Sequence, residues 1–148
     1  MTKIRITKEY HFEMAHALPG YDGLCKNIHG HSYKLFVTII GSPISDKNSP
    51  KCGMVMDFND LKAIVRKEII ERLDHSLALY ENDNNRNDII RATENVVILP
   101  YLPTCENMLE DFAVRIKDKL PANVKLYSIM LRETATSFAE WYAEDNRC

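Results

Sequence analysis

The chain is predicted to fold as an α+β protein built on a four-stranded antiparallel sheet with two helices. Two alternating, strand-like segments open the sequence, two amphipathic helical segments occupy its middle, and two further strand-like segments close it. This ββααββ order keeps strands apart from helices, which is typical of α+β folds. A length of 148 residues suits one domain, residues 1–148, with a core of its own.

The two opening strands are predicted at residues 4–16 and 31–41. The first alternates apolar and polar residues, and the second is rich in β-branched and aromatic residues. A turn-rich segment separates them. Residues 42–52 contain two prolines and are expected to form a loop, after which residues 53–56 complete the hairpin.

Two helices are expected to begin at capping residues. Asp57 is a suitable N-cap for a helix that runs to Leu73, and Thr104 is a suitable N-cap for the second helix. Each helix carries an apolar stripe at helical spacing: Leu61, Ile64, Val65, Ile69 and Leu73 in the first, and Met108, Leu109, Phe112, Ile116 and Leu120 in the second.

The remaining segments are a polar loop and the closing strands. Residues 81–88 are predicted to form a solvated loop tip, and residues 96–99 are apolar enough to pair briefly with a strand. The last two strands are expected at residues 124–133 and 137–142.

The second strand carries apolar residues on both faces. Leu35, Val37 and Ile39 alternate with Phe36 and Ile40. A four-stranded sheet that is covered by two helices on one side leaves the other side and both edges without a partner. Because long open edges are a liability, the sequence predicts oligomerisation through the sheet.

Composition excludes several function classes. A formal net charge of −2 with 27% charged residues gives no electrostatic footprint for nucleic acid. No apolar run approaches the roughly 18 residues of a membrane-spanning helix. The four cysteines are scattered, and the amino terminus does not resemble a signal peptide, so a reducing cytoplasm is the expected compartment.

Three histidines are arranged as metal ligands. His29 and His31 are two residues apart, so on a strand both imidazoles point to one face, and His16 ends the preceding strand. Three neutral imidazoles suit zinc and leave a fourth position open for water or substrate. His11 has the opposite parity to His16 and is expected to take no part.

Cys25 is compatible with three interpretations. It could be a fourth ligand of a closed structural site, a thiolate base activated by a nearby cation, or a small buried hydrophobe. Its polar neighbours Lys26 and Asn27 argue against burial. Cys52, Cys105 and Cys148 have no companions at ligand spacing and are not assigned a role.

Several acidic residues elsewhere in the chain have an ordinary structural explanation. Asp74 and His75 could form a proton-transfer pair, or His75 could interact with the dipole at the end of the first helix. Taken by spacing alone, Glu133 is a solvated strand end. Glu106 is explained as an acid in the first turn of the second helix.

Taken together, the motifs resemble those of the 6-pyruvoyltetrahydropterin synthase and 6-carboxytetrahydropterin synthase family. The resemblance covers nearly the whole chain. The matching motifs, in order, are Phe12-Glu13-Met14-Ala15-His16, Cys25-x₃-His29-Gly30-His31, Asp57-Phe58-x₂-Leu61-Lys62, Leu73-Asp74-His75, Pro103-Thr104-Cys105-Glu106-Asn107 and Arg132-Glu133-Thr134.

The resemblance implies a tunnelling fold, in which three subunits close their sheets into a barrel and two trimers commonly stack into a hexamer. It also implies roles for individual residues. His16, His29 and His31 hold zinc, Cys25 accepts a proton, and Asp74 and His75 form a relay. Glu133 anchors the pterin ring and acts with the relay, while Thr104 and Glu106 line the pterin pocket at a subunit interface.

The three-residue spacer between Cys25 and His29 is similar to that of the bacterial carboxy-forming enzymes. The implied reaction converts 7,8-dihydroneopterin triphosphate to 6-carboxy-5,6,7,8-tetrahydropterin, acetaldehyde and triphosphate, on the route to queuosine. The alternatives are a pyruvoyl-forming synthase that releases triphosphate alone and a non-catalytic protein with structural zinc. The polar segment 80–102 departs from compact family members.

Overall fold

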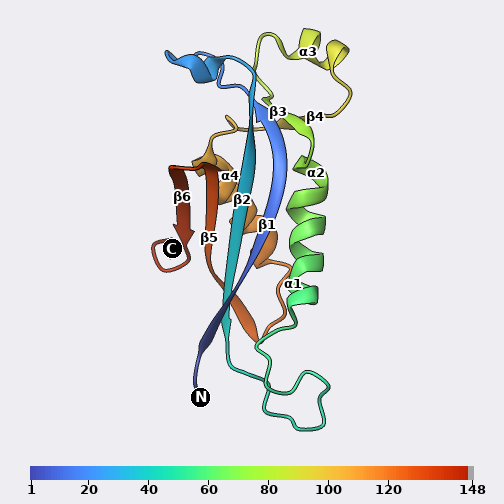
Figure 1. The fold of residues 1–148 in the computed structure, drawn as a ribbon, viewed down its shortest axis with the longest axis vertical. Helices are drawn as coiled ribbons and strands as arrows, with labels where there is room; N and C mark the ends of the chain where they lie inside the picture. Colours follow the sequence, from blue (N-terminus) through green and yellow to red (C-terminus); the bar gives the residue numbers. More distant parts are fainter. Residues whose placement is uncertain (147–148) are drawn as a thin grey trace.

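The computed structural model describes residues 1–146, which form a curled six-stranded sheet with helices on one side (Figure 1). The strand order across the sheet is β4-β3-β1-β2-β5-β6. The strands are β1 (Ile4–His16), β2 (His29–Gly41), β3 (Ser76–Tyr80), β4 (Val96–Leu99), β5 (Val124–Thr134) and β6 (Ser137–Tyr142). The α+β class and the four antiparallel strands predicted from the sequence are confirmed.

The centre of the sheet is a long antiparallel hairpin. β1 pairs with β2 over its whole length, from Ile4 opposite Gly41 to His16 opposite His29. β5 pairs antiparallel with β2, and β6 with β5. This register brings the end of β1 next to the beginning of β2, where the predicted metal ligands lie.

The predicted strand count was wrong. β3 lies parallel to the last three residues of β1, from Met14 to His16, and β4 lies parallel to β3. β3 follows the first helix directly and is only five residues long, so local periodicity does not distinguish it from a helix end. The brief pairing expected at 96–99 is β4.

Residues 53–56 are not a strand, in contrast to the prediction. Gly53 has a φ of +84° in a turn, and two backbone hydrogen bonds join Ile44 to Gly53 and Met54. Val55 and Met56 are buried, and the chain then enters the first helix. Apolar character here therefore reflects core packing and not strand pairing.

The predicted helices and their caps are confirmed. The first is continuous through α1 (Phe58–Val65), the π-helical turn η2 (Arg66–Ile70) and α2 (Glu71–Leu73), and Asp57 accepts the Asn59 N–H. The second is α4 (Cys105–Lys117), where Thr104 accepts the Asn107 N–H. An additional short helix, α3 (Arg86–Ala92), lies within the polar segment whose first part was expected to be a loop.

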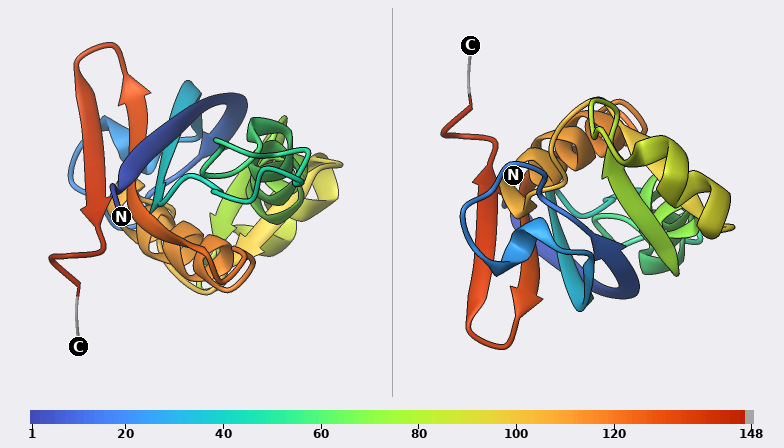
Figure 2. Two further views of the ribbon diagram at one scale, coloured as in Figure 1. Left: turned by 90° about the horizontal axis from the view of Figure 1, so that it is seen from below. Right: turned by 90° about the horizontal axis from the view of Figure 1, so that it is seen from above.

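The helices cover one face of the sheet, and the hairpin of β5 and β6 extends beyond them (Figure 2). Leu35, Val37 and Ile39 are fully buried against the helices, while Phe36 and Ile40 on the other face are half-buried. Among the described residues, β1 has no strand partner on its β3 side before Met14, and β6 has none on its outer side. The sheet thus has two open edges and one uncovered, partly apolar face.

Within residues 1–146, no helix has both the length and the apolar character that crossing a membrane requires.

Candidate metal centre and active site

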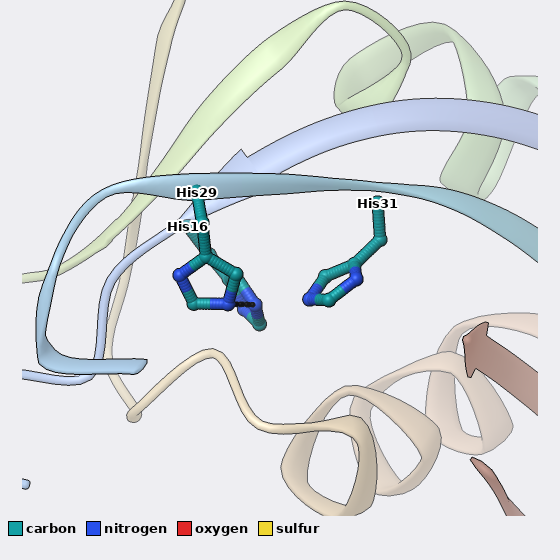
Figure 3. Close-up of side chains that lie close together, drawn as sticks. All are labelled: His16, His29 and His31. Carbon is teal, nitrogen blue, oxygen red and sulfur yellow. Dashed lines mark hydrogen bonds between the residues drawn. The ribbon is translucent and has the colours of Figure 1, made fainter. Parts of the chain in front are cut away.

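His16, His29 and His31 converge at one end of the central hairpin (Figure 3). His16 and His29 are directly opposed in the β1–β2 register, and His31 is two residues further along the same face of β2. One ring nitrogen from each histidine lies within 4.8 Å of the other two. The predicted ligand set is therefore brought together by strand pairing, and it could hold a metal ion.

The hydrogen bonds of two rings fix their tautomers. His16 Nδ1 lies 2.7 Å from the Pro103 carbonyl oxygen, and His29 Nδ1 lies 2.7 Å from that of Asn27. Since a carbonyl oxygen only accepts, each Nδ1 carries the proton, which leaves a lone pair on each Nε2 of the neutral rings. The two Nε2 atoms are 3.1 Å apart, a contact that repels unless a cation lies beside both. This donor set fits a metal ion and matches the usual arrangement of histidine ligands.

Burial favours the neutral form of two of the rings, the form that metal binding requires. Burial lowers the pKa of His16, which is 2% exposed, and outweighs the opposing effects of Pro103 and Glu133. Burial also lowers the pKa of His31. His16 and His31 therefore offer lone pairs over a wider acidic range than a free histidine would.

A carboxylate faces the histidine cluster. Glu133 Oε1 lies 3.5 Å from His16 Nε2 and 3.6 Å from His31 Nε2, and it accepts the Tyr33 hydroxyl proton at 3.2 Å. Burial and Glu133 both raise the pKa of Tyr33, so this phenol remains a donor. Glu133 is therefore not a solvated strand end, as spacing alone suggested, but part of the site.

A cavity of about 310 Å³ opens beside the cluster and contains several of the predicted site residues. His16 forms part of its wall. Its lining also includes Cys25, Thr104, Glu106 and Glu133. The structure thus places His16 of the histidine cluster, the candidate base and the candidate pterin-binding residues around one space.

Cys25 lines this cavity without joining the cluster. It lies in the single turn η1 (Leu24–Lys26), is half-buried, and its backbone carbonyl accepts the Leu18 N–H. Among residues 1–146, the cluster of side chains that could bind a metal consists of the three histidines and does not include Cys25. Cys25 therefore shares a cavity wall with His16 and lies outside the group of potential ligands, which favours the base over the fourth ligand.

Sequence spacing did not single out Cys105, yet its side chain also lines the cavity. Its thiol donates to the Leu131 carbonyl oxygen at 3.5 Å, and burial, with Glu133 and Glu106, raises its pKa to about 12. Cys105 is thus a buried, protonated residue of the cavity wall, whereas Cys25 is half-buried. Cys52 is exposed, and Cys148 lies outside the described residues.

Asp74 and His75 form a pair, but away from the Cys25 cavity. The His75 Nδ1 lies 2.9 Å from Asp74 Oδ1, which also accepts the Glu13 N–H. His75 has a φ of +60° and a side chain that is 77% exposed. It lines a separate cavity with Glu13 and Ser32, whose side chains alternate away from the helix-covered face. The two side chains are thus in contact, while His75 lines a different cavity from the candidate base, and the proton-transfer role stays a prediction.

Comparison with known proteins identifies the family. The model of the 6-pyruvoyl tetrahydropterin synthase family matches residues 5–144. The chain belongs to this family. Its relatives include proteins named 6-carboxy-5,6,7,8-tetrahydropterin synthase from Haemophilus influenzae, with 39% identity over 93% of this chain and 97% of the relative, and from Synechocystis, with 40% identity over 93% and 92%.

Solved structures of other proteins share this fold. An uncharacterized protein of Wolinella succinogenes aligns with a TM-score of 0.80 at 20% identity, covering 97% of this chain and 99% of that one. The 6-pyruvoyl tetrahydropterin synthase of Caenorhabditis elegans aligns with a TM-score of 0.67 at 22% identity, covering 97% of both chains. The tunnelling fold expected from the motifs is thus confirmed.

Proposed function

We propose that the chain is a zinc-dependent 6-carboxy-5,6,7,8-tetrahydropterin synthase. It would convert 7,8-dihydroneopterin triphosphate to the carboxypterin, acetaldehyde and triphosphate, in the route to queuosine. The observation that carries this proposal is a three-histidine group, one member of which, His16, lines the same cavity as Cys25 and Glu133. Relatives of that name at 39–40% identity support the carboxy-forming branch.

Zinc is the metal that best suits His16, His29 and His31, because three neutral imidazoles with an open fourth position are typical of catalytic zinc. Bound there, it would act as a Lewis acid on hydroxyl groups of the substrate side chain. The backbone carbonyls of Pro103 and Asn27 orient two of the rings by accepting their Nδ1 protons.

Cys25 is proposed as the base that removes a proton from the substrate side chain. Its place on the cavity wall, outside the histidine cluster, supports this role. A cation held by the histidines would favour the thiolate, the form that accepts a proton. Burial keeps the Cys105 thiol protonated, so it is not a competing base.

Glu133 is proposed to anchor the pterin ring by accepting hydrogen bonds from its amino and ring N–H groups. The Tyr33 hydroxyl fixes one carboxylate oxygen, and Thr104 and Glu106 line the same cavity as further ring contacts. Holding the ring determines which carbon faces Cys25, and positioning of this kind is a major contribution to catalysis.

Asp74 and His75 are proposed to complete the site of a neighbouring copy as its proton relay. The His75 side chain is 77% exposed and lines a different cavity from Cys25, which supports a shared site. The open edges of β1 and β6 provide surfaces on which copies could join. A trimer closes such edges into a barrel, and two trimers would give a hexamer.

Product analysis tests the proposed reaction. The zinc-loaded protein should convert dihydroneopterin triphosphate to a carboxypterin with one acetaldehyde per turnover. A pyruvoyl pterin without acetaldehyde would indicate the other branch of the family. A protein that binds zinc in its native assembly but converts no pterin would support the structural-zinc alternative.

A further inference from the structure

The pairing of β2 with β5 ends before β2 does. The register stops at Lys34 opposite Arg132, whereas β2 continues back to His29. Beyond this pair β5 leaves β2 and turns into β6, with Thr134 opposite Ser137. Within the part of the chain that the structure describes, residues 29–33 therefore have no strand partner on this side. The sheet has a notch there, next to the histidine cluster.

A cavity of about 600 Å³ lies in this notch. Two of its lining residues, His31 and Glu133, belong to the candidate active site. The lining also includes Ser32, Lys34 and Arg132. These three alternate with His31 and Glu133 along β2 and β5, so their side chains lie toward the uncovered face. The notch thus connects the candidate active site with the opposite side of the sheet.

The uncovered side of the notch carries two neighbouring cations. Lys34 and Arg132 are direct cross-strand partners, and like charges in such a position are destabilising. The ion pairs among residues 1–146 include no carboxylate bound to either residue. Glu13, an acid on this face, lies across β2 and accepts the Ser32 hydroxyl proton at 2.7 Å. Two adjacent cations without an acidic partner are suited to an anion.

Local contacts hold the Arg132 guanidinium in place. Its Nη1 donates to the Ala135 carbonyl oxygen at 3.1 Å, and its carbon atom lies 4.7 Å from the centre of the Phe138 ring. Arginine has five N–H donors, so this bond leaves others for a ligand. A positioned guanidinium beside a lysine is a common phosphate-binding arrangement.

We propose that Lys34 and Arg132 bind the triphosphate of the pterin substrate. This inference rests on the proposed function and extends it by defining how the substrate is oriented. The pterin ring would lie at Glu133 and the triphosphate at the notch. In the elimination, a proton leaves one side-chain carbon, a double bond forms, and the C–O bond to triphosphate breaks with its electron pair on the departing oxygen. The two cations would stabilise that negative charge.

Inorganic tripolyphosphate is a direct probe of the pair. The zinc-loaded protein should bind it in a calorimetric titration, and Lys34→Met or Arg132→Met should each weaken binding roughly ten- to hundredfold, the range for a charged hydrogen bond. Arg132→Lys keeps the charge and should lose less. Lys125→Met, on the same face at the far end of β5, should bind as the unchanged protein does. Melting temperature and zinc content establish that each variant is folded.

Two outcomes would overturn the proposal. The double variant Lys34→Met/Arg132→Met could bind tripolyphosphate as tightly as the unchanged protein. Alternatively, binding could persist in the double variant and disappear when zinc is removed, which would place the anion on the metal.

Turnover separates this inference from the proposed function. If the unchanged protein converts dihydroneopterin triphosphate, the double variant should show a raised KM, and an unchanged KM and kcat would refute the triphosphate site alone. If the unchanged protein converts no pterin but binds tripolyphosphate through Lys34 and Arg132, the anion site stands and the proposed reaction fails.

Discussion

The histidine cluster and the Asp74–His75 pair differ in how completely one chain assembles them. The cluster is held by the β1–β2 register, His16 is 2% exposed, and backbone carbonyls orient two of its rings. The pair also has a short internal contact, but the His75 side chain is 77% exposed and does not line the Cys25 cavity. One chain therefore assembles the proposed metal ligands completely, while the histidine of the proposed relay faces outward.

This difference indicates where an assembly would contribute. Metal binding depends on residues from two adjacent strands and should need no second copy. The proposed proton relay depends on Asp74 and His75, and because the His75 side chain is 77% exposed, it should need a neighbour that covers this side chain. Substitutions in the histidine cluster and in the Asp74–His75 pair should therefore differ in their effects on metal content, with the largest effect at the histidines.

His29→Ala should abolish activity by removing the metal. Two imidazoles hold zinc weakly, and the variant should also lose the stabilisation that a bound metal gives the native state. Metal content, melting temperature and turnover should fall together, whereas folding of the metal-free chain should survive because His29 lies at the margin of the core. Retention of one zinc per subunit would show that the cluster has been assigned wrongly.

Cys25→Ala should keep the metal and lose the reaction. Because Cys25 lies outside the cluster, about one zinc per subunit should remain, while turnover falls by roughly 10²–10⁴-fold, as for loss of a general base. Cys52→Ala, which changes an exposed cysteine away from this cavity, is the matched control and should be fully active. Zinc loss from Cys25→Ala would make this residue a ligand and overturn its catalytic role.

His75→Ala should reduce turnover by about 10²-fold, at the lower end of the range for proton-transfer groups, because water can reach its place. Zinc content and melting temperature should not change, since the side chain is largely exposed. The matched control is His11→Ala, another exposed histidine paired with an acid, Glu9, at 2.9 Å. Equal activity of His75→Ala and His11→Ala would show that His75 has no part in proton transfer.

Tyr33→Phe should have the smallest effect. The ring is almost fully buried and phenylalanine preserves its packing, but the carboxylate of Glu133 loses one hydrogen bond. We expect a loss in kcat/KM of no more than about tenfold, near the lower limit for a charged hydrogen bond. Because burial raises the pKa of Tyr33, the ratio to the unchanged protein should stay constant from about pH 6 to pH 9. A ratio that varies over this range would show that the phenol ionises.

Local signals predicted the convergence of the three histidines and the helices well. The spacing of His29 and His31 and the position of His16 needed only strand alternation and one hairpin. The caps Asp57 and Thr104 likewise act within one turn of their own helices. Such features depend on short-range geometry, which a sequence displays directly.

Features that depend on distant segments were missed. The parallel pairing of β3 with β1 joins residues about sixty positions apart, and Ser76–Tyr80 has no periodicity that reveals it. Cys105 enters the cavity only because α4 begins beside the end of β5, and the notch exists because β5 turns away after Arg132. No local pattern shows which face His75 occupies relative to Cys25.

The central claim is that Cys25 and His75 act in one site while belonging to different copies of the chain. Inactive Cys25→Ala and His75→Ala proteins can be mixed, dissociated and reassembled in equal amounts, and their turnover then measured. Random assembly should restore about one quarter of the sites, because half of the chains carry each intact residue and a site draws on two neighbours. Reassembled mixtures that stay as inactive as the separate variants would contradict the claim and place both residues in the same chain's site.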